Sequence, residues 1–403
     1  MYPSRVNTDR STPGSQTSLR EANRLRLVDA VKRFGGLTQV ELAAATGLST
    51  ATVSTIVKEL IAAGVVETHT TSRSGRRAQK VTIARRVGLV AGVQVGHRHL
   101  QVTLADFSRT VVAEQQMPLP AEHRLDTGLD RVALLIVDLL ERVGAQTDEL
   151  LAVGLALPAP VDSATGMISV RGVLRGWDDT HIGQVLSKRL ATPVFVENDA
   201  NLGALAEHDF GAARGARDSI FVRASYGTGA GLVLGDHLHR GYAGTAGEIG
   251  HVQITPDGPI CRCGNRGCLE TVVGATALLE MLRTSHGPLT LRDVIAQAIE
   301  GDPGCRRVVA DAGARIGAAV ATLATGINPQ CVVVGGELAE TGEVLVGPLR
   351  EAVLRHVVPN TLAPLEVVVG ELGTRAEVMG AVALALRSTD VASDGSAVQG
   401  FAP

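Results

Sequence analysis

The sequence predicts an α/β protein in which an N-terminal winged helix-turn-helix domain precedes a larger, two-lobed α/β domain. The chain of 403 residues is longer than one hydrophobic core usually organises. Residues 1–86 contain 14 Lys or Arg against 6 Asp or Glu, whereas the rest of the chain contains 24 against 35. Residues 87–388 run twice through three strands followed by alternating helices and strands. These observations predict a basic domain suited to polyanions over 20–86 and two lobes with a cleft between them over 87–388.

The N-terminal domain is expected to begin with one helix. Residues 1–19 are rich in Ser, Thr, Pro and Gly without periodicity, so we expect them to be disordered. A helical pattern starts at Glu21 and stops at the glycine pair 35–36. The apolar stripe of this helix consists of Leu25, Leu27, Val28, Val31 and Phe34.

Capping residues then predict a helix-turn-helix. Thr38 and Glu41 form a capping box for a short helix over 39–46, and Gly47 permits a tight turn. Ser49 is the expected N-cap of a third helix over 50–63. The inward face of this helix is Val53, Ile56, Val57, Leu60 and Ile61, and its exposed start carries Thr50, Ala51, Thr52 and Ser54. Such small side chains permit close approach to base edges in the major groove.

A hairpin with a basic tip follows the third helix. Apolar stretches over 65–68 and 80–83 flank the polar segment 70–78. Arg73, Arg76 and Arg77 in that segment would lie along phosphates or enter a minor groove. The alternative is a protein-interaction module whose arginines form a solvated face. Helix, turn, helix, wing and basic charge together favour operator DNA as the partner.

Strand and helix patterns outline the larger domain. The first lobe is expected to contain strands over 88–95, 99–106, 111–117 and 150–157 and a helix over 129–143. The second is expected to contain strands over 220–225, 229–234, 251–254 and 331–335 and helices over 304–325 and 375–387. We expect the tail over 389–403 to be disordered.

Composition indicates a cytoplasmic protein with no membrane partner. Hydrophobic residues make up 45% of the chain and aromatic residues 2%, so the core must consist mainly of Ala, Val and Leu. No apolar run reaches the roughly 18 residues of a membrane span, and the charged start has no apolar signal-peptide core.

The cysteines predict a metal site. His251 precedes Cys261, Cys263 and Cys268, and together they offer three thiolates and one imidazole, a complete tetrahedral shell for a structural zinc ion (Zn²⁺). The alternative is that they are merely buried thiols. The two remaining cysteines, Cys305 and Cys331, lie in apolar surroundings and are expected in the core.

Four motifs carry a resemblance to a known family. They are Val-Glu-Asn-Asp-Ala-Asn over 196–201, Gly-Thr-Gly-Ala-Gly over 227–231, Gly-Thr-Ala-Gly-Glu-Ile-Gly-His over 244–251, and the cysteine-rich block over 261–270. With these motifs the chain resembles the ROK family, named for repressors, open reading frames and kinases, and the winged helix is similar to that of its transcriptional regulators. The resemblance implies an actin-like, ribonuclease-H-like sugar-kinase fold with sugar bound in the cleft between the lobes.

The resemblance also implies a set of sugar ligands. Matched motif by motif, they are Asn198, Asp199, Glu248, His251 and Glu270. Carboxylates, amide and imidazole are groups that pair with sugar hydroxyls. His251 would bind zinc through one ring nitrogen and sugar through the other. Glu197 and Glu207 are expected to be structural or solvated instead.

The stretch that organises Mg²⁺ in the family's kinases is altered. In those kinases the stretch resembles Asp-x-Gly-Gly-Thr-Lys. This chain has Gln94-Val-Gly-His-Arg-His99 there, so a neutral amide replaces the carboxylate. Ala159 also stands where kinases commonly have Gly. Asp199, which would be the general base in a kinase, and the glycine pair 335–336 are retained. We therefore expect a non-catalytic sensor that does not use ATP; the alternative is a bifunctional sugar kinase with a DNA-binding domain.

This interpretation implies particular partners. A helix-turn-helix protein matches two half-sites, so the resemblance implies a homodimer or homotetramer that represses carbohydrate-utilisation genes. The effector would be a sugar or sugar phosphate, and its identity does not follow from the ligand set.

Overall fold

The computed structural model describes residues 16–73, 76–120, 125–162, 164–170, 173–174, 176–177, 180–392 and 397–399. The chain divides into two compact units. The first comprises Met1–Leu89, Ala105–Val111 and Leu386–Pro403, and the second comprises Val90–Leu104 and Val112–Ala385.

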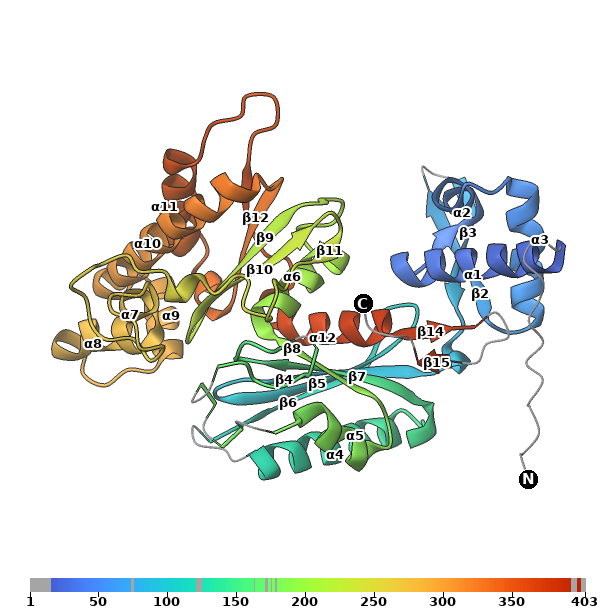
Figure 1. The fold of residues 1–403 in the computed structure, drawn as a ribbon, viewed down its shortest axis with the longest axis horizontal. Coiled ribbons are helices and arrows are strands. Elements are labelled where there is room, and N and C mark those ends of the chain that lie inside the picture. The colour runs from blue at the N-terminus through green and yellow to red at the C-terminus, as the bar shows by residue number, and fades with distance from the viewer. Residues whose placement is uncertain are drawn as a thin grey trace, which may run out of the picture. The chain divides into compact units, whose positions relative to one another are not determined.

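The first unit contains the winged helix (Figure 1). Its elements are α1 (Gln16–Phe34), β1 (Leu37–Thr38), α2 (Gln39–Thr46), α3 (Thr50–Ala62), β2 (Val66–Arg73) and β3 (Arg76–Ile83), with the strands in the order β1-β3-β2. The capping box at Thr38 and Glu41 and the N-cap at Ser49 are confirmed. Gly47 ends α2 with φ 69°, in the left-handed region that favours glycine.

Several expected details of this unit differ. The helix α1 already includes residues 16–19, which we expected to be disordered, and residues 1–15 lie outside the described part. Leu25, Phe34 and Ile61 are 39%, 52% and 42% exposed, because so small a core covers only the centre of each apolar stripe. The wing strands are also longer than predicted, since the backbone ladder continues through their polar outer halves.

The tail that we expected to be disordered contributes strands to the first unit. Residues Thr389–Val391 form β14, which pairs with β15 (Ala397–Gln399). The Nζ of Lys32 donates a hydrogen bond to the carbonyl of Thr389 and lies 3.8 Å from a carboxylate oxygen of Asp390. Composition alone did not reveal this contact with α1. A second contact at the same helix end comes from Arg109, which donates to the carbonyls of Lys32 and Arg33.

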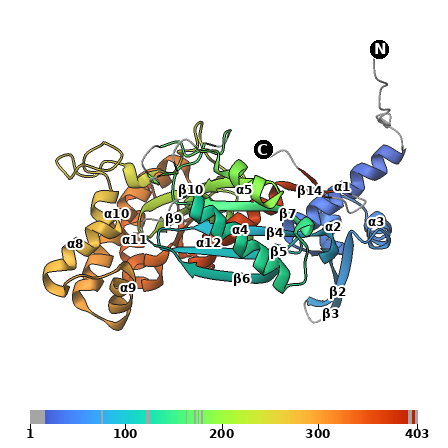
Figure 2. The same cartoon turned by 90° about the horizontal axis from the view of Figure 1, so that it is seen from below.

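The first lobe of the larger domain is built on one five-stranded sheet. Its strand order is β6-β5-β4-β7-β8, and α4 and α5 cover one face (Figures 1 and 2). The elements are β4 (Leu89–Val95), β5 (His99–Asp106), β6 (Val111–Pro118), α4 (Leu125–Arg142), β7 (Leu150–Leu157), α5 (Ile182–Leu190) and β8 (Val194–Asn198).

The second lobe repeats that topology. Its sheet has the order β11-β10-β9-β12-β13, so in both lobes the third, second, first, fourth and fifth strands along the chain lie side by side. The elements are β9 (Ser219–Ala224), β10 (Thr228–Leu234), β11 (His237–Leu238), β12 (Cys331–Gly335) and β13 (Glu366–Val369). The repeat confirms the two-lobed α/β fold.

Two helices, α6 (Asp199–Phe210) and α12 (Ala376–Arg387), lie between the two sheets (Figure 1). Glycines let α12 approach its neighbours closely. A Cβ added to Gly154 in β7 would lie 2.0 Å from the carbonyl oxygen of Ala381, and one added to Gly380 would lie 1.9 Å from that of Leu202 in α6. Backbone against backbone leaves no room for sliding, so α12 is packed rigidly at these points.

The remaining helices complete the second lobe. They are η3 (Ile249–His251), α7 (Glu270–Val273), α8 (Ala275–His286), α9 (Leu291–Glu300), α10 (Pro303–Ile327), η4 (Glu337–Thr341), α11 (Glu343–His356) and η5 (Gly373–Arg375). By length and composition α10 could cross a membrane, but it packs beside α11 (Figure 2) and supplies core residues such as Val309 and Ile316. Cys305 and Cys331 are buried as expected.

The strand expected over 251–254 is wrong. The short helix η3 ends at His251, and Gln253 makes only an isolated bridge with Cys268. Val252 is 48% exposed, whereas Ile254 packs against the hydrophobic core of the second lobe, so the apolar pattern there does not come from a strand.

Candidate functional site

The four residues predicted to bind a metal lie together. The Sγ of Cys261 is 3.4 Å from Nδ1 of His251, and the Sγ of Cys263 is 3.7 Å from that of Cys268. All four ligand atoms lie within 4.8 Å of one another. The loop closes through Gly267, where a Cβ would meet the carbonyl oxygen of Thr255 at 1.5 Å. The cluster could hold a metal ion, and its donor set fits the tetrahedral preference of zinc.

A pocket of about 230 Å³ adjoins this cluster. Four of the five residues implied as sugar ligands line it, namely Asn198, Asp199, Glu248 and His251. The fifth, Glu270, does not line the pocket. It accepts a hydrogen bond of 2.8 Å from the backbone N–H of Thr228, and Thr228 does line the pocket. Because Nδ1 of His251 faces Cys261, its Nε2 remains on the pocket side, 3.8 Å from a carboxylate oxygen of Glu248.

The junction between β8 and α6 positions the first two of these residues. Asn198 caps α6, and its Oδ1 accepts from the N–H groups of Ala200 and Asn201. Its Nδ2 donates to the carbonyl of Ala159, 3.1 Å away. One N–H of the Asn198 amide therefore remains for a ligand. Asp199 follows in the first turn of α6, where the helix dipole favours a carboxylate.

A buried arginine that sequence reasoning missed holds Asp199. Arg223 in β9 has its Nε 3.3 Å from Asp199 and 2.8 Å from Glu377, while its Nη2 is 3.9 Å from Glu337. Burial raises the pKa of Asp199, and the Arg223 guanidinium opposes that shift. Burial raises the pKa of Glu377 to about 7. A charged side chain in the otherwise apolar strand Ser219–Ala224 was the signal that could have revealed this network.

Glu248 on the other side of the pocket is also perturbed. Burial, with the nearby Asp199 charge, raises the pKa of Glu248 to about 7. A carboxyl group that exchanges its proton near neutral pH can donate or accept a hydrogen bond to a sugar hydroxyl.

The two acidic residues expected to be structural have fold partners. Glu207 accepts hydrogen bonds from the backbone N–H groups of Ala212 and Leu372 at 2.7 and 3.0 Å. Glu197 accepts from the amide of Asn201 and pairs with Arg240 at 2.5 Å.

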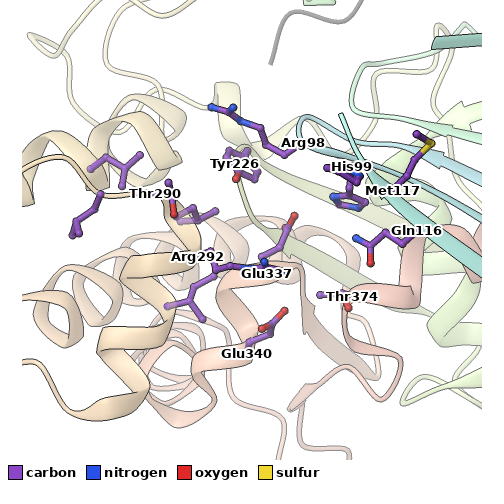
Figure 3. Close-up of a pocket in the computed structure, with 15 residues that line it drawn as sticks. Arg98, His99, Gln116, Met117, Tyr226, Thr290, Arg292, Glu337, Glu340 and Thr374 are labelled. Carbon is purple, nitrogen blue, oxygen red and sulfur yellow. The ribbon is translucent and has the colours of Figure 1, made fainter. Parts of the chain in front are cut away.

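A second, larger cavity of about 750 Å³ lies in the same unit (Figure 3). Its lining includes the basic side chains of Arg98 and Arg292, the carboxylates of Glu337 and Glu340, and Tyr226 (Figure 3). Burial opposes the charge of Glu337, but the Arg223 guanidinium and a hydrogen bond from Ser225, together with weaker contributions, lower the pKa of Glu337. An ionised carboxylate in this wall repels anionic phosphates.

The residue that we expect at the position of the kinase carboxylate is buried. Gln94 in β4 is 3% exposed, and its Oε1 has no hydrogen-bond partner within the described residues. Ala159, the other expected departure from the kinase pattern, is 2% exposed and lines the smaller pocket.

The predicted recognition helix presents small polar groups. Thr50 and Ala51 are exposed, and Thr52 and Ser54 are half-buried at the start of α3. The hydroxyl of Thr52 lies 2.8 Å from that of Ser49, the N-cap, so part of its hydrogen-bonding capacity is used. In the wing, the backbone register places Arg73 opposite Arg76 and Arg77 opposite Ser72, beside the turn residues 74–75, which lie outside the described part.

Comparison with known families separates the two units. The model of the ROK family matches residues 90–388, and that of the MarR family matches residues 21–78. The first match covers more than half of the chain, and the second coincides with the helix-turn-helix and most of the wing.

Similar proteins include sugar regulators that align along nearly the whole chain. One is the DNA-binding transcriptional dual regulator NagC of Escherichia coli (strain K12), 31% identical over 397 residues, which cover 94% of this chain and 97% of that protein. Another is the xylose repressor of Bacillus subtilis (strain 168), 28% identical over 371 residues, which cover 91% and 95%.

Solved structures give the same division. A ROK family transcriptional regulator, described as a homolog of the E. coli MLC protein, has a TM-score of 0.72 and 26% identity and covers 94% of this chain and 97% of its own. A ROK family glucokinase from Streptomyces griseus, in complex with glucose and AMPPNP, has a TM-score of 0.66 and 27% identity and covers 74% and 100%. The regulator aligns with both units, whereas the kinase aligns with about three quarters of the chain.

Proposed function

Because the chain belongs to the ROK family, we propose that this sugar-responsive DNA-binding repressor recognises its effector in the pocket formed by Asn198, Asp199, Glu248 and His251. The observation that carries the proposal is the meeting of these four side chains beside the Cys/His cluster, in a chain that also has a winged helix. Two carboxyl groups, an amide and an imidazole supply the donors and acceptors that neighbouring sugar hydroxyls need.

The ion in the Cys/His cluster is zinc in this proposal. His251, Cys261, Cys263 and Cys268 would hold it, and it would fix the orientation of the His251 ring. Glu270 then acts indirectly, by holding the Gly227–Thr228 turn at the pocket wall.

Phosphoryl transfer is not part of the proposed function. Gln94 supplies no charge to organise Mg²⁺, and Arg223 pairs with Asp199, the only retained candidate for a general base. The bifunctional kinase remains the second candidate, because the Gly227–Thr228 turn is kept and the chain is similar to a glucokinase structure. ATP turnover with glucose, N-acetylglucosamine or xylose would distinguish the two.

DNA recognition falls to the start of α3 and to the wing. Thr50, Ala51, Thr52 and Ser54 would face base edges, and Arg73, Arg76 and Arg77 would contact phosphates. Replacing Thr52 with alanine should relax preference mainly at one base position, whereas Arg76→Ala should weaken binding broadly and flatten its salt dependence. The protein would act in the cytoplasm as a homodimer or homotetramer on two half-sites.

The testing experiment measures sugar binding and operator binding on one protein. Thermal shift with glucose, N-acetylglucosamine and xylose, each alone and as its phosphate, should find a ligand that raises the melting temperature. The same ligand should lower affinity for an operator duplex selected from a random DNA library by about 5-fold to 150-fold. Equal binding of operator and scrambled DNA, or an effector without influence on either, would contradict the proposal.

A further inference from the structure

The buried charge network around Asp199 reaches the first turn of α12. Arg223 lies 3.3 Å from the Asp199 carboxylate on one side and donates to Glu377 at 2.8 Å on the other. Arg223 is 6% and Glu377 2% exposed, so neither ion pair is screened by solvent. A change in the charge or position of Asp199 is therefore felt directly at the N-terminal end of α12.

The helix α12 is packed so that it can move as a rigid element and cannot bend in response to such a change. A Cβ on Gly92 in β4 would lie 2.4 Å from the carbonyl oxygen of Val378, and close contacts of the same kind fix Ala381 and Gly380. Helix and neighbours meet backbone to backbone, which permits rigid movement of the packed layer but not bending of the helix alone.

The chain that leaves α12 is attached to the DNA-binding domain. Ser388 and Thr389 are 3% exposed, and the Thr389 carbonyl accepts a hydrogen bond from Lys32 in the last turn of α1. The Lys32 side chain is 12% exposed, so this contact is also shielded from water. The helix α1 packs against α2 and α3, the helix-turn-helix itself.

We propose that Arg223 is a positioning residue that links the pocket ligand Asp199 to α12, and that Lys32 passes the position of α12 to α1. The inference rests on the proposed function, because it assigns the residues through which an occupied pocket would change operator affinity. A ligand that hydrogen-bonds Asp199 competes with Arg223 for its oxygens and shifts Arg223 towards Glu377. The resulting displacement of α12 moves Thr389 and, through Lys32, the recognition helix.

The first experiment needs no effector. Operator affinity is measured for the full-length protein, Glu377→Ala, Lys32→Gln and the double variant, with the duplex selected by the wild type. Each single variant should change affinity by about 2-fold to 30-fold, and Glu377→Ala should have no further effect once Lys32 is replaced. Independent, multiplicative effects of the two substitutions would overturn the proposal.

Two conservative variants separate coupling from charge and from folding. Glu377→Gln keeps an oxygen that accepts from Arg223, so it should behave as wild type. Arg26→Gln removes the same charge from an exposed position on α1 and should leave the effect of Glu377→Ala intact. If Glu377→Ala unfolds, the second experiment still tests the linkage through Lys32→Gln, because Lys32 is not part of the buried charge network around Asp199.

The second experiment uses as probe whichever of N-acetylglucosamine, glucose or xylose weakens operator binding by the wild type. In Lys32→Gln the probe should bind free protein normally but no longer change operator affinity. Retained coupling in Lys32→Gln would overturn this inference and leave the proposed function standing. If no probe affects the wild type, the proposed function fails, while the first experiment still tests the linkage.

Discussion

Arg223 connects the two cavities of the larger unit, because it lines the smaller one and lies 3.9 Å from Glu337 in the wall of the larger one. The cavities differ in the other groups that line them. Around the smaller cavity, Asp199 and Glu248 stand beside the Cys/His cluster that could hold a metal ion, and Arg223 supports the Asp199 carboxylate. The wall of the larger one combines the carboxylates of Glu337 and Glu340 with the basic side chains of Arg98 and Arg292. We propose that recognition of a sugar and transfer of a phosphoryl group are separable properties of this fold, and that this chain retains only the first.

The largest effect should come from removing the pocket carboxylate. Asp199→Ala should weaken sugar binding by about 10-fold to 150-fold, because a hydrogen bond to a charged group contributes about 1.5–3 kcal/mol. Isothermal titration would measure it. The matched variant Glu340→Ala, in the wall of the other cavity, should bind sugar as wild type does. Equal losses in both variants would mean that the cavities do not divide their roles.

Loss of the metal should lower sugar affinity, even where the substituted metal ligand does not contact the sugar. Cys263→Ala removes one of the four ligands, so metal content should fall from close to one zinc per chain, and sugar affinity should drop by about 10-fold to 100-fold as His251 loses its orientation. The matched control is Cys331→Ala, a buried cysteine in neither candidate metal group of the described residues, which should retain the metal. Full metal content in Cys263→Ala would contradict the assigned cluster.

The pH dependence of folding stability should report on Glu377, the partner of Arg223 in the buried charge network. The pKa of Glu377 is raised by burial from 4.5 to about 7, so the folded state holds a proton that the unfolded chain releases near pH 4.5. The stability from this group is present below pH 4.5 and is lost as the pH rises through about 7. Urea titrations should therefore show a steeper fall between pH 5 and pH 7 for wild type than for Glu377→Gln. Parallel pH profiles would show that Glu377 titrates normally.

Local signals in the sequence are enough to predict the domains, the helix caps and the Cys/His cluster, but not the contacts between residues far apart in the chain. The caps at Thr38 and Ser49 and the Cys/His spacing act over a few residues, so they were visible before the structure. The pairing of Arg223 with Glu377 joins positions 154 residues apart, and that of Lys32 with Thr389 joins positions 357 apart. Contacts at such separation leave no periodicity in the chain, which is why the tail beyond 389 looked disordered.

The smallest effect should come from restoring the kinase carboxylate. Gln94→Asp reintroduces a charge at the end of β4, yet Asp199 stays paired with Arg223 and the ionised Glu337 still faces the larger cavity. We expect no sugar phosphate above background with ATP and Mg²⁺, and sugar affinity within about twofold of wild type because Gln94 does not line the sugar pocket. Coupled ADP-release assays on both proteins, with Arg223→Lys/Gln94→Asp as a further variant, would measure turnover.

Robust phosphorylation by the wild type would show that Gln94 does not prevent catalysis. Turnover in Gln94→Asp alone would show that this one amide, rather than the Arg223 network, separates the sensor from the kinase.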